Sequence, residues 1–330
     1  MGGIKVDELK QEIVASLSNN SKFTFYDDCR IIPHGRLKVI NKDELQRLYV
    51  SGSISVQHAF VLRAINALSH ATSKMILQLL QLQRRITPRK DIMDYTDKQL
   101  GSLLEYLGRN GLVFCYEYMT ADGSKILIYT CSSQGYQFFK NRLEVVDAFD
   151  DSAVFRGDHD IFKRLACNSV ALALAQDNRC VDCVINGRFS MSTEPKKFST
   201  YIYAAAEFMI EGKKKLFIIE PTYFSIDYDI CTDEEEMLKI NNRITKLAGF
   251  IDKYKETSED TVIPIMCVEG VQSLKQLGRL LKSRDDNISE IVLATSENIL
   301  FKNRYALERS FIKFTIGDKI TVTPVGSDWL

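Results

Sequence analysis

Apolar residues repeat at helical spacing in two blocks that begin near Ser55 and Ser73. Thr72 and Ser73 separate the blocks, and both residue types are suited to capping the start of a helix. The blocks therefore predict two helices that meet near His70. Their apolar positions are Val56, Phe60, Ile65 and Leu68 in the first block, then Met75, Ile76, Leu79 and Leu80 in the second.

A third helix with one leucine face is predicted over residues 97–109. Thr87 and Pro88 first indicate a short helix that ends around Tyr95, and Thr96 can cap the longer helix that follows. Leucines gather on one side of this longer helix, which leaves a polar side free to contact another molecule. The leucines are Leu100, Leu103, Leu104 and Leu107, and the polar side holds Lys98, Gln99, Ser102, Glu105 and Arg109.

A two-stranded hairpin is predicted directly after this helix. Asn110 and Gly111 favour the end of the helix, since both accept a left-handed backbone. Residues 112–118 and 125–131 are rich in aromatic and β-branched side chains, and an Asp-Gly pair joins them. A further helix follows at 133–143. This order predicts a winged helix-turn-helix domain over residues 54–143, with residues 97–109 as the recognition helix and the hairpin as the wing.

The remaining segments predict a preface, a linker and an α/β domain. Residues 1–53 hold an expected helix at 4–18 and short strands at 22–26 and 36–40, while the acidic stretch 144–157 is expected to be a linker. Residues 158–330 alternate between helical and strand patterns, which predicts a mixed α/β sheet domain. Expected helices are 160–175, 233–254 and 273–282, and expected strands are 181–185, 199–209, 215–219, 262–268, 290–294 and 319–324.

Charge and hydropathy narrow the expected function. The chain has 43 Lys and Arg against 43 Asp and Glu, so any DNA contact must come from a local patch instead of bulk charge. No apolar run is long enough to span a bilayer and the start lacks a signal-peptide pattern, so we expect a cytoplasmic protein without membrane contact.

The residues of the predicted winged helix domain favour duplex DNA as its partner. Lys98, Gln99 and Ser102 would reach base edges in the major groove, while Arg109 and wing Lys125 would meet phosphates. Asp97 and Glu105 interrupt this surface, which leaves a protein-binding winged helix as the alternative. Further basic positions that we expect to contact DNA are Lys74, Arg84, Arg85, Arg89 and Lys90.

Cysteine spacing gives little support for a metal. Eight cysteines are scattered, mostly in apolar segments where a thiol packs as a small hydrophobe. Cys180 and Cys183 form one close pair, with His159 and Cys167 as the available additional zinc ligands. We expect reduced structural thiols and no cofactor.

Several segments in order resemble the replication-relaxation type proteins of bacterial plasmids and integrative elements. The resemblance covers most of residues 55–255 and is carried by Gly157-Asp158-His159, Tyr201-Ile202-Tyr203-Ala204, the run from Lys215 to Glu220, Lys246-Leu247, Phe250 and Tyr254. It implies a winged helix followed by a domain of restriction-endonuclease-like type. A bacterial mobile-element protein acting in plasmid replication, transfer or their regulation is therefore expected.

The nuclease motif that this resemblance implies is incomplete. Such a site needs an aspartate on one strand and Glu-x-Lys on the next, to hold Mg²⁺ and assist an attacking water. Here Tyr201 to Tyr203 occupy the first position, and Pro221 and Thr222 follow Glu220. The Glu211-Gly212-Lys213 run is expected in a turn. We predict no catalytic residues, with Glu220 as a weak metal-ligand candidate.

Three hypotheses for function follow. The first is a non-enzymatic DNA-binding protein whose C-terminal domain supports homodimerisation or extra DNA contact, with replication or transfer proteins as further partners. The second is a Mg²⁺-dependent endonuclease that uses Glu220. The third is a transcription regulator whose α/β domain senses a ligand or a protein partner.

Overall fold

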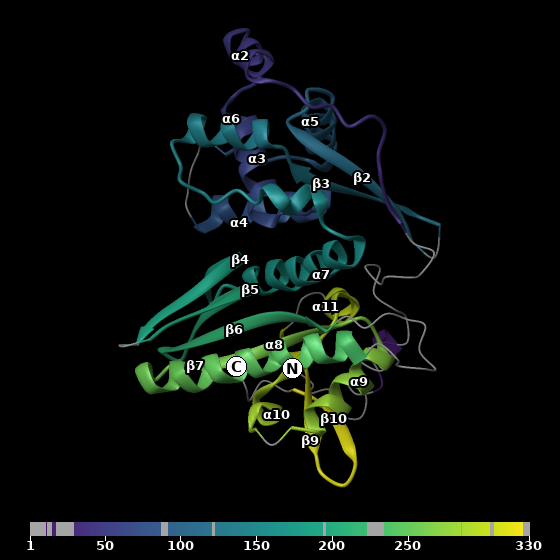
Figure 1. Cartoon of the computed structure of the whole chain (residues 1–330), viewed down its shortest axis with the longest axis vertical. Coiled ribbons are helices and arrows are strands. Elements are labelled where there is room, and N and C mark those ends of the chain that lie inside the picture. Colours follow the sequence, from purple (N-terminus) through teal and green to yellow (C-terminus); the bar gives the residue numbers. More distant parts are fainter. Residues whose placement is uncertain are drawn as a thin grey trace, which may run out of the picture. The chain divides into compact units, whose positions relative to one another are not determined.

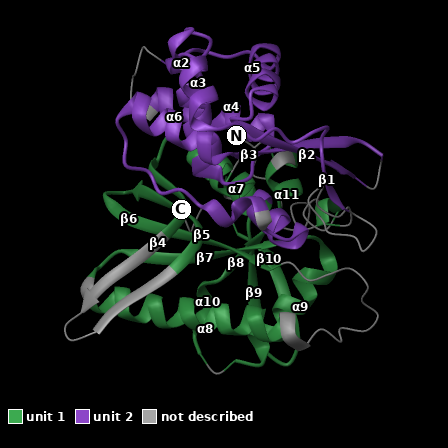
Figure 2. Cartoon of the chain, turned by 45° about the horizontal axis from the view of Figure 1, so that its top comes forward, with its two compact units in different colours: residues 1–27, 166–330 green, residues 28–165 purple. Residues whose placement is uncertain are grey.

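The protein has a mixed α/β fold, and its chain divides into two compact units in the computed structural model. One unit holds residues 28–165, and the other holds residues 1–27 and 166–330 (Figure 2). The structure describes residues 11, 15–17, 30–86, 92–120, 123–193, 196–222, 234–284, 286–303 and 307–325. No helix within these ranges is long and apolar enough to cross a membrane.

The unit of residues 28–165 combines a helical cluster with a small antiparallel sheet (Figure 1). Its strand order is β1-β2-β3. The apolar face of α3 forms the centre of this core, with Ala59, Leu62 and Ile65 each fully shielded from solvent. The elements are β1 (Ile31–Pro33), α2 (Lys42–Val50), α3 (Val56–Leu68), α4 (Ser73–Ile86), α5 (Asp97–Arg109), β2 (Val113–Met119), β3 (Lys125–Cys131), α6 (Ser133–Leu143), η1 (Asp151–Phe155) and the start of α7 (Asp158–Ala175).

The N-terminal part of this unit differs from the sequence prediction. Residues 36–40 are not a strand; β1 lies earlier and pairs with β2, with Ile32 opposite Glu117. Residues 36–40 run as extended loop instead, and Ile40 is buried beside the end of α5. Helix α2 was not predicted; it has no fully buried side chain, and its apolar side is short, with Leu45 and Leu48 partly buried. The expected helix at 4–18 and strand at 22–26 fall largely outside the described residues.

Two other segments of this unit also differ in detail. Residues 92–96 are not helical, and the first part of the short helix expected before Tyr95 lies outside the described residues. The acidic stretch 144–157 packs back on the unit. Asp147 accepts hydrogen bonds from Arg63 at 2.6 and 3.1 Å, and Asn66 donates to the carbonyl of Ala148 at 2.9 Å. Its acids therefore serve as partners for partly buried cations, and the compact unit continues to residue 165.

The second unit is built on a seven-stranded sheet with the order β10-β9-β8-β7-β6-β5-β4. Strands β6, β7 and β8 are parallel and the other neighbours are antiparallel. The elements are the end of α7, β4 (Cys180–Thr193), β5 (Lys196–Ile210), β6 (Lys213–Thr222), α8 (Glu234–Thr257), β7 (Thr261–Val268), α9 (Val271–Lys282), α10 (Ile288–Ile291), β8 (Leu293–Thr295), α11 (Glu297–Lys302), η2 (Leu307–Arg309), β9 (Ile312–Ile316) and β10 (Ile320–Pro324).

Helices cover both faces of this sheet. Ile218 of β6, Phe250 of α8 and Leu277 of α9 belong to one buried cluster, which places α8 and α9 on the same face. On the other face Cys167 of α7 lies against Cys267 of β7, with 4.0 Å between the two sulfurs. The strand expected at 290–294 is instead the short helix α10 followed by β8, and β9 and α11 were not predicted.

Candidate nucleic-acid interface

Helix α5 begins at a reciprocal cap that the sequence supplies. The Thr96 hydroxyl accepts a hydrogen bond from the backbone N–H of Gln99 at 3.3 Å, and the Gln99 side-chain oxygen accepts from the backbone N–H of Thr96 at 2.9 Å. This capping box satisfies two N–H groups that the first turn leaves without partners. It also fixes the side chain of Gln99 against the helix start.

One face of α5 is buried and the other is exposed, as the leucine spacing predicts. Leu100, Leu104 and Leu107 are 0 to 1% exposed. The helix ends before Gly111, whose φ of 69° favours glycine and whose added Cβ would lie 2.9 Å from Ile40. On the outer face the exposed residues are Asp97, Lys98, Gln99, Ser102, Glu105 and Arg109.

Most polar side chains on this outer face already have partners within the helix. The Ser102 hydroxyl donates to the carbonyl of Lys98 at 3.1 Å, and Arg109 forms an ion pair with Glu105. Gln99 retains only its amide NH₂ group for an outside contact. The Lys98 ammonium group has no hydrogen-bond or ion-pair partner in the described part of the chain, so it is the cation on α5 most available to a ligand.

The β2–β3 hairpin follows α5 after a short connection. Its turn is closed by the Thr120 N–H, which donates to the Ser124 carbonyl at 2.9 Å, and Gly123 there has a φ of 81°. Lys125 begins β3 and lies 3.5 Å from Glu117. Glu117 also accepts from His34 at 2.8 Å, and this hydrogen bond is the main cause that lowers the pKa of Glu117. Glu117 was not predicted from the sequence. Its carboxylate partly neutralises the charge of Lys125, the residue that we predicted to contact a phosphate.

The remaining predicted contacts lie on α4 or beyond the described residues. Lys74 lies in the first turn of α4, and Arg84 and Arg85 lie in its last turn. Arg84 forms an ion pair with Asp94 at 2.8 Å. Arg89 and Lys90 lie outside the described residues.

The unit that carries these groups is richer in cations than the chain as a whole. Residues 28–165 contain 19 Lys and Arg against 15 Asp and Glu, whereas the rest of the chain contains 24 against 28. The zero net charge of the sequence therefore conceals a separation between the units. A modest positive balance on one unit favours contact with a polyanion there.

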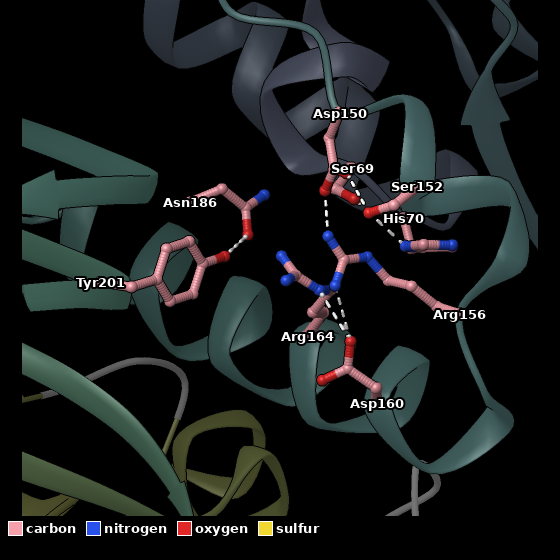
Figure 3. A network of polar contacts seen from close by, with 9 residues as sticks. All are labelled: Ser69, His70, Asp150, Ser152, Arg156, Asp160, Arg164, Asn186 and Tyr201. Atoms are coloured by element: carbon pink, nitrogen blue, oxygen red, sulfur yellow. Dashed lines mark hydrogen bonds and ion pairs between the residues drawn. The ribbon is translucent and has the colours of Figure 1, made fainter. Parts of the chain in front are cut away.

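A partly buried polar network in the same unit was not predicted (Figure 3). Asp160 accepts from Arg156 at 2.9 Å and from Arg164 at 3.4 Å, and Arg156 also pairs with Asp150. His70, in the turn between α3 and α4, lies beside these cations, and burial lowers its pKa to about 3, with Arg164 and Arg156 adding to the shift. The i, i+4 spacing of 156, 160 and 164 was the signal in the sequence. The network ties the segment before α7 to that turn.

Glu220 has a structural partner in the second unit. It is 2% exposed, and its two carboxylate oxygens accept from Arg243 of α8 at 2.7 and 2.8 Å. Arg243 also lies 5.8 and 5.7 Å from the ring centres of Tyr201 and Tyr203. Burial raises the pKa of Glu220, and Arg243 opposes that rise. A metal at Glu220 would have to displace Arg243.

The thiols of Cys180 and Cys183 likewise lie near backbone carbonyl groups of their own unit. The Cys180 thiol donates to the Asp182 carbonyl at 3.3 Å, and the Cys183 thiol points to the Ala171 carbonyl at 3.8 Å. Burial raises the pKa of Cys183, which disfavours the thiolate that zinc requires. Within the described residues there is no group of three or more His, Cys, Asp or Glu side chains that could hold a metal.

Comparison with known proteins adds little to this picture. No protein-family model matches the chain, and no curated protein matches it. Among solved structures it shows similarity to protein VC1899 from Vibrio cholerae, with 14% identity and a TM-score of 0.25. The match covers 81% of this chain and 55% of that one, so the chain spans about half the length of this relative. A similarity at this TM-score supports no conclusion about fold or function.

Proposed function

We propose that the protein binds double-stranded DNA through residues 28–165, which we interpret as a winged helix-turn-helix unit. The observation that carries the proposal is the two-sided helix α5. Its leucine side is buried, its polar side is exposed, and the β2–β3 hairpin follows it directly. A helix presented in this way after two packed helices suits the major groove, and the hairpin suits an adjacent stretch of backbone.

The charge distribution supports a polyanionic partner. Lys98 is exposed and unpaired within the described residues, while Arg109 and Glu105 form a surface pair. Exposed pairs of this kind contribute only about 0.3–0.5 kcal/mol, so Arg109 can exchange Glu105 for a phosphate at little cost. Lys125 can exchange its contact with Glu117 in the same way.

In this proposal the second unit is not a nuclease. A restriction-endonuclease-like site would need Glu220 as a free carboxylate, and a bidentate arginine occupies it. The resemblance to plasmid replication-relaxation proteins suggests a role in replication, transfer or their regulation, with homodimerisation through the α/β unit. A protein partner for α5 and a ligand-sensing role for the second unit are the competing proposals.

Binding to duplex DNA by the full chain tests the proposal. Fragments selected from random DNA would supply a site, and fluorescence anisotropy would measure affinity across a range of salt concentrations. We expect Lys98→Ala with Arg109→Ala to weaken binding and to reduce the salt slope by up to about 2. Lys42→Ala with Arg47→Ala on α2 is the matched control. Equal affinity and slope for both variants would refute the role of α5.

A further inference from the structure

Helix α9 of the second unit carries an exposed stripe of cations that no acid accompanies. Lys275, Arg279 and Lys282 are exposed and follow one another at i, i+4 and i+7, so they lie on one side of the helix. The helix, which runs from Val271 to Lys282, contains no Asp or Glu. We call these three residues the α9 stripe.

The α9 stripe gathers three cations on one side of a single helix. Elsewhere in the described part of this unit Arg179, Lys214, Arg243 and Arg284 have acidic partners, and exposed cations without an ion pair, such as Lys213 of β6 and Lys313 of β9, lie on separate elements. Within the described residues no ion pair involves a member of the stripe; Lys282 donates to the backbone carbonyl of Asp318 at 2.7 Å. Like charges at i, i+4 destabilise a helix, and α9 itself holds no acid that would offset the cost of Lys275 beside Arg279.

The helix dipole explains only part of this arrangement. Arg279 and Lys282 lie in the last turn, where cations stabilise the negative end of the helix. Lys275 lies in the middle of the helix, outside the range of that effect. A partner that carries several negative charges accounts for all three positions.

The side of α9 opposite the stripe packs closely against the rest of the second unit. Leu277 is fully buried in the sheet core, and Gly278 approaches the hairpin of β9 and β10 so closely that an added Cβ would lie 3.0 Å from Ile320 and 3.4 Å from Phe314. The opposite, charged side therefore faces outward in a fixed orientation. Figure 1 shows α9 next to β10 in this unit.

We propose that the α9 stripe is a second contact surface for the phosphate backbone of duplex DNA. Seven residues of helix place its ends about 10 Å apart, and a duplex presents about six charges over that length. The exposed side of α9 contains Gln272 and the three cations and no aromatic ring. It therefore lacks the stacking platform that single-stranded DNA would need, and it suits backbone contact without base reading.

This inference extends the proposed function, and one experiment separates the two. DNA binding by the full chain would be measured against salt for wild type, for Lys275→Gln with Arg279→Gln and Lys282→Gln, and for a control with Lys213→Gln, Lys255→Gln and Lys313→Gln. Glutamine preserves helix propensity, and circular dichroism would confirm that each variant is folded. We expect the stripe variant to lose up to about 2.7 from the salt slope and the control to match wild type.

The outcomes are distinguishable. Failure of the wild type to bind DNA would overturn the proposed function together with this inference. A wild type that binds DNA with a stripe variant no different from the control would overturn the α9 surface alone. Sedimentation with phosphatidylserine vesicles is the second arm: loss of vesicle binding in the stripe variant with an unchanged DNA slope would assign the surface to a membrane and overturn it for DNA.

Discussion

At the scale of single residues, ion pairs within the protein decide which of the predicted DNA-contacting side chains remain available to a ligand. Sequence reasoning placed several cations on or near the outer face of α5, and the structure gives Arg84, Arg109 and Lys125 acidic partners. A pattern of residue types cannot foresee such pairs when they join separate elements, as Lys125 and Glu117 do across two strands. The exposed and unpaired state of Lys98 emerges only from the structure.

Because His70 is buried, we expect the unfolding free energy of the protein to fall as the pH is lowered. Its folded pKa is lowered to about 3, mainly by burial, while the unfolded chain keeps a value near 6.5. Above pH 6.5 neither state binds the proton. Below it the unfolded chain does, so the unfolding free energy falls by up to about 1.4 kcal/mol per pH unit toward pH 3. Urea unfolding at pH 7, 6 and 5 would show a shallower loss for His70→Gln than for wild type; equal slopes would contradict this assignment.

The Glu220–Arg243 pair predicts a strong and asymmetric effect on stability. Glu220→Ala leaves the partly buried Arg243 guanidinium without its carboxylate partner, so we expect a loss of about 3 kcal/mol in unfolding free energy. Adding Arg243→Met should recover part of that loss, because the uncompensated charge is removed. Urea denaturation of the two variants measures this. A double variant less stable than Glu220→Ala would show that the pair does not act as a unit.

At the scale of elements, helices and strands with a regular apolar spacing could be predicted from the sequence. Elements whose position depends on residues far along the chain could not. Leucine spacing and the Thr96 cap located α5 to the residue, since both signals are local. Helix α2 has no fully buried side chain, so its signals are the Asn41–Glu44 capping box and a short apolar side. Strand β9 alternates buried Ile312 and Phe314 with exposed Lys313, a short signal that gains meaning only once β8 and β10 flank it.

Two glycines on different helices of the unit of residues 28–165 should respond oppositely to alanine. A Cβ at Gly135 of α6 would lie 2.2 Å from the backbone carbonyl oxygen of Leu112, so Gly135→Ala must shift the backbone and should cost about 1–3 kcal/mol. Gly101 of α5 has nothing within 4 Å, so Gly101→Ala should stabilise by up to about 1 kcal/mol through helix propensity. Thermal unfolding compares them, and shifts of the same sign would contradict the packing described for α6.

At the scale of the whole molecule, the sequence predicted a mixed α/β protein in two parts with the boundary at residues 144–157, whereas the compact units divide between residues 165 and 166. The acidic run at 144–157 suggested a linker because composition alone cannot show that Asp147 binds Arg63 or that Asp150 binds Arg156. The compact unit extends to residue 165, within α7, so one continuous helix belongs to both units. The two units also differ in net charge, because residues 28–165 hold an excess of cations and the rest of the chain holds an excess of acids. The total composition of the chain cannot show this difference.

Absence of cleavage is the expected behaviour of the whole chain with Mg²⁺ and supercoiled DNA. Arg243 occupies both carboxylate oxygens of Glu220, so a metal ion there would have to displace it. Agarose gels of plasmid DNA after incubation would show no nicked or linear product above that of a heat-inactivated sample. Cleavage that disappears with Glu220→Gln would reinstate the endonuclease hypothesis.

A photochemical cross-link from α5 to duplex DNA tests the central claim most directly. A photoreactive amino acid at position 102, on the exposed face of α5, would be irradiated with a selected duplex, and the same substitution at position 137, on the exposed side of α6, serves as the control. We predict an adduct from position 102 that maps to bases in the bound site, and none from position 137. DNA binding without an adduct at position 102, or with equal adducts at both positions, would contradict recognition by α5.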